Sequence, residues 1–136
     1  MKLFRRCKMR LAEEADAPKV ARLFRELDRD LSLGEIDDLI RDKRVVLLRK
    51  KKKTLGAFSF ARIGLGIFAL LYIRKLVIDK KFRGQGLGGR TLAKLRVFTR
   101  RKKAQGFFLW SRQSAKNFYL KNKLKNWWRF FWHRVD

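Results

Sequence analysis

The sequence is short of residues that would mark several classes of protein. It has one cysteine, Cys7, so a fold held by internal disulfides is excluded. That cysteine and the one histidine leave no motif with metal-ligand spacing, and we expect no metal. No run of about 18 uncharged apolar residues is present, so we expect no membrane span. The N-terminal MKLFRRCKMR lacks a long apolar stretch after its basic residues, so we expect no secretory signal and a cytoplasmic location.

Acidic residues are scarce after residue 42. The 136 residues include 37 Lys and Arg but 12 Asp and Glu, a net charge of +25. Residues 1–42 are neutral, with 10 side chains of each sign, whereas residues 43–136 carry 27 basic and 2 acidic side chains, Asp79 and Asp136. Such a field attracts polyanions and repels cations.

Hydrophobic spacing predicts one mixed α/β domain over residues 1–136, with a sheet covered by helices. We expect strands at residues 3–11, 45–48, 55–63, 107–110 and 127–135, and a long apolar strand at 67–78 that should need a bulge or kink. Helical spacing predicts helices at residues 16–31, 35–42, 86–104 and 114–121, with Gly34 separating the first two and Gly106 ending the third. Residues 49–53 should form a cationic turn, and Gly64 and Gly66 should mark another.

A glycine-rich segment follows the strand at 67–78. Residues 83–90 read RGQGLGGR at the start of an expected helix, where the first amides lack internal partners and the helix dipole favours anions. The glycines let the backbone approach a phosphate, and Arg83 and Arg90 can add charge-assisted bonds. The segment is not a Walker loop, because no Gly-Lys-Ser/Thr follows. It predicts an anion site, with a ligand-free turn as the structural alternative.

Two motifs resemble those of the GNAT superfamily of N-acetyltransferases. Residues 83–88, RGQGLG, match the Q/R-x-x-G-x-G/A motif of that family, after residues 73–82, IRKLVIDKKF, which resemble its fourth strand. Residues 115–119, AKNFY, are similar to its A-x-x-F/L-Y helix. The resemblance covers roughly residues 7–124. It implies a GNAT-like α/β (α+β) fold, with a mixed, mostly antiparallel sheet of six to seven strands flanked by about four helices.

The resemblance also implies a reaction and a site. Acetyl-CoA would be the acyl donor, and a primary amine of a small molecule, peptide or protein would be the acceptor. The pantetheine arm would pair with backbone at Leu76, Val77 and Ile78, in a V-shaped gap beside the strand at 107–110. The pyrophosphate would lie on a loop made of Arg83, Gly84, Gln85, Gly86, Leu87, Gly88, Gly89 and Arg90.

Tyr119 is placed where family members often protonate the leaving CoA thiolate, although packing in a core is an equal alternative. The strand at 67–78 contains no carboxylate, so the usual place for a general base is empty. Asp79 lies at its end, where the alternative to a functional role is that of a turn residue. His133 is expected to be packed or to face solvent.

Other features support different hypotheses. The basic field favours, as the alternative, a nucleic-acid- or ribosome-binding module with a GNAT-like fold, making non-specific contacts with nucleic acid. Residues 107–132 hold 10 of the 18 aromatics, interleaved with Lys and Arg, which can stack bases or form the core of a sheet. The acidic cluster Glu35, Asp37 and Asp38 could attract a cationic amine or simply complement a helix N-terminus. We expect a monomer or a homodimer.

Overall fold

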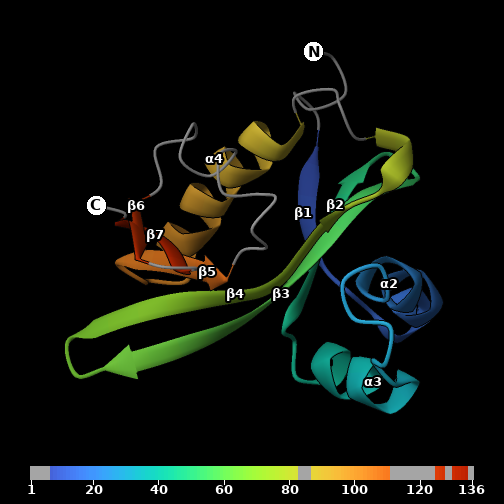
Figure 1. Cartoon of the computed structure of the whole chain (residues 1–136), viewed down its shortest axis with the longest axis horizontal. Helices are drawn as coiled ribbons and strands as arrows, with labels where there is room; N and C mark the ends of the chain where they lie inside the picture. The colour runs from blue at the N-terminus through green and yellow to red at the C-terminus, as the bar shows by residue number, and fades with distance from the viewer. Residues whose placement is uncertain (1–6, 83–86, 111–124, 128–129, 135–136) are drawn as a thin grey trace. The chain divides into compact units, whose positions relative to one another are not determined.

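The chain, analysed as a computed structural model, is described at residues 7–82, 87–110, 125–127 and 130–134. It forms two compact units: unit 1 is Met1–Phe60 with Lys75–Gly88, and unit 2 is Ala61–Arg74 with Gly89–Asp136. Two long strands, β3 (Lys53–Leu65) and β4 (Phe68–Ile78), run through both units (Figure 1). Each unit therefore contains part of one hairpin.

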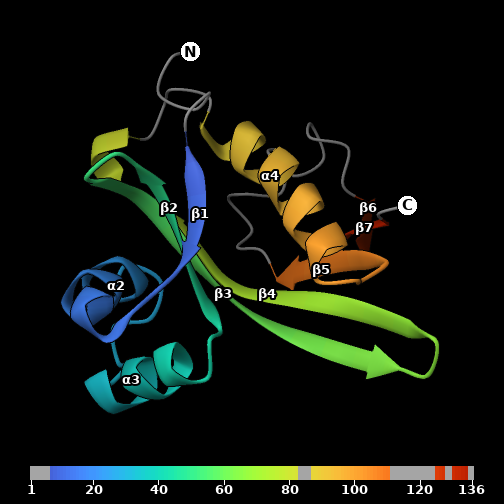
Figure 2. The same cartoon turned by 180° about the vertical axis from the view of Figure 1, so that it is seen from behind.

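Unit 1 contains an antiparallel sheet, and a helical connection joins the first two strands of this sheet. Strands β1 (Lys8–Leu11), β2 (Val45–Lys50) and β3 pair antiparallel, with Leu47 opposite Ala57. The connection from β1 to β2 holds a 3₁₀ turn and two helices, η1 (Glu14–Asp16), α2 (Ala17–Phe24) and α3 (Leu33–Arg41). The two helices lie together beside the strands in both views (Figures 1 and 2).

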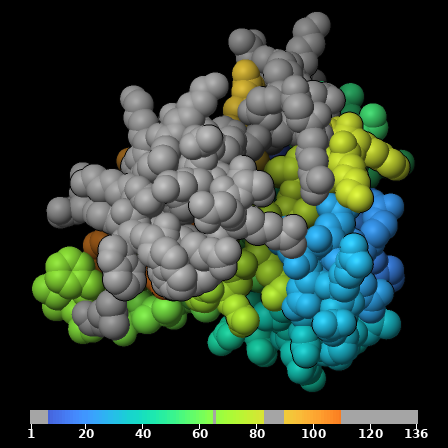
Figure 3. Space-filling model, in the orientation of Figure 1, coloured from blue at the N-terminus to red at the C-terminus, as the bar shows by residue number. Residues whose placement is uncertain are grey.

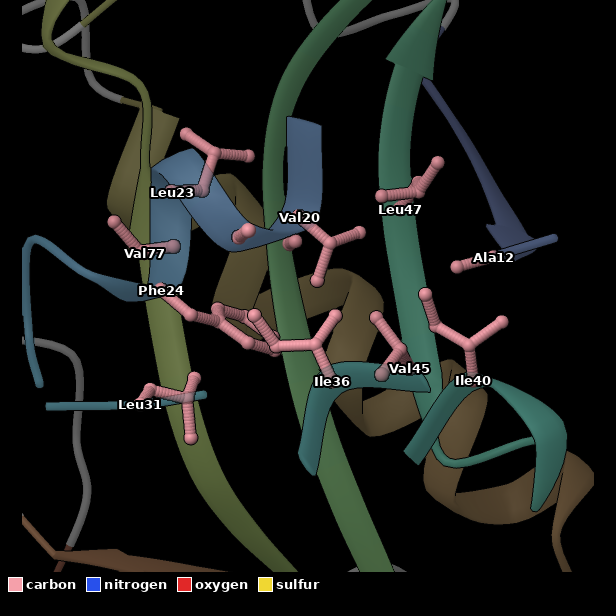
Figure 4. Packing of buried hydrophobic residues seen from close by; sticks show 12 residues of the cluster. Ala12, Val20, Leu23, Phe24, Leu31, Ile36, Ile40, Val45, Leu47 and Val77 are labelled. Atoms are coloured by element: carbon pink, nitrogen blue, oxygen red, sulfur yellow. The ribbon is translucent and has the colours of Figure 1, made fainter. Parts of the chain in front are cut away.

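The core of unit 1 lies between these helices and the sheet. Val20 and Phe24 of α2 and Ile36 of α3 are fully buried (Figure 4). They pack with strand residues of the same cluster, including Val45, Leu47, Ala57 and Val77. Because burying one such side chain contributes about 1.5–3 kcal/mol, this cluster holds both helices on the sheet.

Two expectations for these helices are wrong in detail. Helix α2 ends at Phe24 and does not reach residue 31. The backbone hydrogen bonds after it span three residues instead of four, from the Glu26 N–H to the Leu23 carbonyl and from the Leu27 N–H to the Phe24 carbonyl. Gly34 does not separate the helices but lies inside α3. The helix starts at Ser32, whose Oγ accepts a hydrogen bond from the Glu35 N–H at 3.1 Å.

The strand predictions for residues 45–63 are confirmed, and the basic turn is shorter than expected. Lys50 pairs with Lys53 across the hairpin, so only Lys51 and Lys52 form the turn. Lys51 has a φ of 54°, in the left-handed region. The next hairpin turns at Gly66, which has a φ of 68°, while Gly64 lies within β3. The apolar stretch then forms one strand of 11 residues, β4.

Unit 2 contains a parallel strand pair and a long helix. Strand β5 (Gly106–Trp110) runs parallel to β4 and antiparallel to β7 (Phe130–Arg134), which pairs with β6 (Lys125–Trp127). Two antiparallel strands thus replace the single strand expected at 127–135. Helix α4 (Leu87–Arg101) buries Thr91, Leu92, Leu95 and Thr99, while basic side chains such as Arg100 and Arg101 are exposed.

Helix α4 ends earlier than the sequence predicts. Lys103 takes a left-handed φ of 55°, and the Ala104 N–H donates to the Thr99 carbonyl at 3.1 Å. This is the bond pattern of a helix terminated by a left-handed residue. Gly106, the expected end, is instead the first residue of β5.

The mixed, mostly antiparallel sheet and the three α-helices of the described residues confirm the predicted fold class. The expected totals of six to seven strands and about four helices stay predictions. The fourth helix, expected at residues 114–121, lies outside the described residues, as do residues 3–6 of the first strand. A single domain over residues 1–136 also stays a prediction.

Candidate acyl-CoA site

The end of β4 carries the backbone segment expected to hold the pantetheine arm. Val77 is buried against α2 and α3, while Leu76 and Ile78 on either side of it are half-buried. The register between β4 and β5 covers Leu70–Ile73 and Gly106–Leu109 only. Leu76, Val77 and Ile78 therefore lie beyond that register, and an extended ligand could pair with strand backbone of this kind by strand addition.

Gly56 of β3 supports this segment from the other edge, and sequence reasoning missed it. A Cβ at Gly56 would lie 2.5 Å from the Val77 carbonyl oxygen and 3.1 Å from Ile78 Cδ1. Any side chain would therefore push β3 and β4 apart at the candidate site. A glycine within a strand is itself a signal of close backbone approach, so the position could have been found from the sequence.

Asp79 directs the chain out of β4 toward the glycine-rich loop. Its N–H donates to the Leu55 carbonyl at 2.8 Å, and its own carbonyl accepts from the Phe82 N–H at 2.9 Å. Its Oδ1 accepts from the Lys81 N–H at 3.2 Å. These bonds fix the short turn η2 (Lys80–Phe82), so Asp79 holds the turn, as the sequence indicates.

A second group anchors Asp79 from far along the sequence. Arg22 of α2 donates from Nη2 to Asp79 Oδ2 at 3.4 Å. The Asp79 side chain is nearly buried, whereas that of Arg22 is mostly exposed, so the pair is a modest restraint. It nevertheless links α2 to the start of the loop, a link that sequence reasoning missed.

Only the last four residues of the glycine-rich loop belong to the described part of the chain. Leu87, Gly88, Gly89 and Arg90 form the first turn of α4, and the N-terminus of a helix presents backbone N–H groups to an anion. No Asp or Glu occurs between residues 80 and 135, so no carboxylate from that part of the sequence would repel an anion here. The remaining predicted loop residues, Arg83, Gly84, Gln85 and Gly86, lie outside the described residues, and so does Tyr119.

The first helical turn of unit 1 holds a well-defined ion pair. Arg10 Nη1 donates to Asp16 Oδ2 at 3.0 Å, and the Glu13 N–H donates to the same oxygen at 2.8 Å. Burial by itself would raise the pKa of Asp16, but these two hydrogen bonds and the charges of Arg10 and Arg49 hold the pKa below its ordinary value. The same pair raises the pKa of Arg10.

One member of the acidic cluster forms an ion pair within its own helix. Asp38 pairs with Arg41 one turn later, and Glu35 gives its N–H to the Ser32 cap. Both interpretations of the cluster, as an attractor of a cationic amine and as a helix charge bias, stay predictions. His133 lies on β7 opposite Phe107 in the register. Tyr72 of β4 and Phe108 of β5 stack with centroids 4.8 Å apart, an aromatic contact that sequence reasoning did not single out.

The described residues contain neither a metal site nor a membrane-spanning helix. No group of three His, Cys, Asp or Glu side chains in this part of the chain could hold a metal ion. None of the helices described here combines the length and apolar character needed to cross a membrane.

Comparison with solved structures shows the fold. N-acetylglutamate synthase from Neisseria gonorrhoeae, solved with coenzyme A and N-acetyl-glutamate, has a TM-score of 0.79 at 16% identity, covering 96% of this chain and 35% of its own. This chain thus spans about a third of that enzyme. Ard1 from Thermoplasma volcanium has a TM-score of 0.76 at 16% identity, covering 96% of this chain and 99% of its own. A GNAT-family acetyltransferase from Listeria monocytogenes 4b F2365 has a TM-score of 0.72 at 13% identity, with 95% of each chain covered.

Comparison with protein families shows the relationship. No curated protein matches this chain. The family model for the acetyltransferase (GNAT) domain matches residues 41–123, more than half of the chain, from the last residue of α3 through the predicted phosphate loop and Tyr119. None of these matches supports the alternative of a nucleic-acid- or ribosome-binding module. The chain belongs to the GNAT acetyltransferase family.

Proposed function

We propose that this chain transfers an acetyl group from acetyl-CoA to a primary amine of a small molecule, peptide or protein. Family membership supports acetyl transfer. The observation that carries the proposal is the path of the chain at the end of β4, where Asp79 turns a strand into the loop that opens α4. The similar synthase was solved with coenzyme A, which supports CoA as the carrier.

The donor would be held mainly by backbone groups. The pyrophosphate would accept hydrogen bonds from amides of residues 83–89, at the positive end of the α4 dipole. Arg83 and Arg90 would add charge. Backbone N–H and C=O groups of Leu76, Val77 and Ile78 would pair with the amides of the pantetheine arm. Because these contacts are partly ionic, affinity for acetyl-CoA should fall as salt is added.

The chemical step requires positioning and two proton movements. The neutral amine nitrogen attacks the thioester carbonyl carbon, the C–S bond breaks, and the amine loses a proton while the leaving thiolate gains one. Tyr119 is our candidate for the group that protonates the thiolate. Since β4 carries no carboxylate, the acceptor should have to arrive as the free base. The rate should therefore rise with pH until the acceptor amine is largely deprotonated.

Binding calorimetry with acetyl-CoA tests the donor site. Gly86→Asp should abolish binding, because a carboxylate would occupy the place of a phosphate and repel it. Gly64→Asp is the matched control: it adds the same charge on β3, where a new Cβ has no atom within 4 Å, and it should bind normally. Equal binding by Gly86→Asp and the wild type would remove the loop from the proposed site.

An assay of free thiol release identifies the acceptor class. Wild-type protein should release CoA thiol from acetyl-CoA when supplied with a primary amine, from a panel spanning small amines and peptides. Thiol release that no amine stimulates would overturn the proposal of amine acetylation while leaving donor binding intact.

A cytoplasmic location, the monomeric or dimeric state, and non-specific contact with nucleic acid stay predictions.

A further inference from the structure

The tip of the β3–β4 hairpin in unit 2 leaves large apolar side chains in water. Ile63 is 38% exposed, Ile67 is 90% exposed and Phe68 is 55% exposed. We call these three residues the hairpin tip. The light-green atoms of this hairpin reach the surface in the space-filling view (Figure 3). Exposed apolar groups gathered at one place commonly mark an interaction site.

Hydrogen bonds attach the end of α4 to this hairpin. Arg62, next to Ile63, donates from Nε to the Lys102 carbonyl at 3.1 Å and from Nη2 to the Lys103 carbonyl at 3.4 Å. The Ala69 N–H, next to Phe68, donates to Gln105 Oε1 at 2.7 Å, and the Gln105 N–H donates to the Ala69 carbonyl at 2.9 Å. The C-terminal end of α4 and the residues that flank the hairpin tip therefore form one structure.

That end of α4 is strongly cationic. Arg100, Arg101 and Lys103 are exposed, and we call these three the α4-end cations. Lys102, between them, lies with its Nζ 5.6 Å from the centre of the Phe98 ring. The described part of unit 2 contains no Asp or Glu, so no carboxylate within it can neutralise these charges.

We propose that the hairpin tip and the α4-end cations dock unit 2 on the surface of an anionic lipid bilayer. This goes beyond acetyl transfer and does not depend on it. The tip would enter the boundary between headgroups and acyl chains, while the cations meet lipid phosphates and carboxylates. An apolar insertion and an adjacent basic cluster are the two signals that together give stable attachment of a peripheral protein.

The charge and the size of the patch argue against other occupants. A second copy of this chain carries the same charge of +25 and would be repelled. A stable protein interface buries about 800 Å² on each partner, more than three side chains at a turn provide. Nucleic acid would use the cations, but the aliphatic Ile63 and Ile67 cannot stack on bases as aromatic residues do. A fluid bilayer accepts a small apolar tip without a matching pocket.

Co-sedimentation of the full chain with lipid vesicles tests the proposal. The wild type should bind vesicles of phosphatidylcholine mixed with phosphatidylserine much more strongly than vesicles of phosphatidylcholine alone. The variant Ile67→Ser/Phe68→Ser should lose about tenfold in affinity for the mixed vesicles, because the apolar signal is gone. Its affinity for a single-stranded RNA oligonucleotide should stay unchanged.

Two further variants sharpen the result. Leu33→Ser is the matched control, because Leu33 is 53% exposed but lies on α3 in unit 1, and it should bind mixed vesicles normally. Arg100→Gln/Arg101→Gln/Lys103→Gln should weaken vesicle binding and make it less sensitive to salt. Circular dichroism should show that each variant is folded.

The position of the tip in the bilayer can be read directly. A polarity-sensitive fluorophore attached to Ile67→Cys should move to a less polar environment when mixed vesicles are added, whereas one at Leu33→Cys should not. Cys7 is buried and should not react in the folded protein. Undiminished vesicle binding by Ile67→Ser/Phe68→Ser, or an unchanged signal from position 67, would overturn the proposal and leave the cations as a surface for nucleic acid.

Discussion

Unit 1 holds 21 Lys and Arg with 11 Asp and Glu, whereas unit 2 holds 16 Lys and Arg with a single acid, Asp136. In unit 1 charged groups build local structure: Asp16 closes the first helical turn and Asp79 holds the turn after β4. In the described part of unit 2, Arg62 bonds to carbonyls, Lys102 lies over a ring, and the α4-end cations are exposed. Carboxylates thus help to build the fold in unit 1, whereas the α4-end cations of unit 2 are exposed.

The largest effect should separate the chemical step from the binding of acetyl-CoA. Tyr119→Phe, in unit 2, should lower kcat by about a hundredfold or more and leave acetyl-CoA affinity near normal, because a general acid acts in the transition state. Asp79→Ala, in unit 1, should raise the Kd for acetyl-CoA about fivefold and leave kcat nearly unchanged, because the turn before the loop loses its anchor. Steady-state kinetics combined with calorimetry measures both.

The exposed Asp42 of unit 1 provides the control for this pair. Asp42→Ala removes the same charge away from the candidate site and should change neither kcat nor the Kd. Unchanged turnover in Tyr119→Phe would return Tyr119 to a packing role. An altered kcat with an unaltered Kd in Asp79→Ala would show that Asp79 acts in the chemical step.

A smaller effect should appear when the same substitution is made in both units on one strand. Gly56→Ala, in unit 1, places a Cβ 2.5 Å from the Val77 carbonyl oxygen and should lower the free energy of unfolding by about 1–3 kcal/mol. Gly64→Ala, in unit 2, meets no atom within 4 Å and should change it little. Urea unfolding midpoints compare them, and equal midpoints would contradict the close approach of β3 and β4 at Val77.

The smallest effect is a dependence of stability on pH that only unit 1 should show. Folding lowers the pKa of Asp16, so the ionised carboxylate increases the free energy of unfolding. This stabilisation is fully present above the pKa that Asp16 has in the unfolded chain. It is lost as the pH falls through the lower pKa that Asp16 has in the folded chain. Asp16→Asn should therefore cost about 1 kcal/mol at neutral pH, and the difference from wild type should shrink below about pH 4. Urea unfolding across pH measures the difference.

Hydrogen exchange then locates this loss. Lowering the pH should weaken the protection of amide hydrogens in η1 and α2. It should not weaken protection in α4, because residues 80–135 contain no Asp or Glu. Glu14→Gln, at an exposed acid two residues from Asp16, should behave as wild type. A pH profile of Asp16→Asn that runs parallel to wild type would show that the Arg10 pair does not stabilise the folded chain.

The sequence predicts elements well where one periodicity dominates. Alternating or continuous apolar residues located β2, β3 and β5, and helical spacing located α3 and α4, because burial of a face decides these elements. Element ends were less accurate. The end of α2, the Ser32 cap and the left-handed Lys103 depend on single hydrogen bonds and one dihedral angle, which leave little trace in a hydrophobic pattern.

The candidate site divides in a similar way. Its loop could be proposed from sequence because glycine spacing and helix position are local properties. The anchor between Arg22 and Asp79 could not, because the two residues are 57 positions apart and meet only through the packing of α2 on the sheet. The roles of Arg83, Gly84, Gln85, Gly86 and Tyr119 remain predictions, because these residues lie outside the described chain.

Three lysines occupy backbone positions that glycine would fill with less strain. Lys43, Lys51 and Lys103 have φ values of 58°, 54° and 55°. A residue other than glycine in the left-handed region destabilises the fold by roughly 1–2 kcal/mol. A substitution at each of these positions could therefore increase the stability of the protein. Replacing Lys43 and Lys51 by Asn or Gly should relieve strain and reduce the charge together. At Lys103 the same change would also remove one α4-end cation. The free energy of unfolding should then increase, while the affinity for anionic vesicles should decrease.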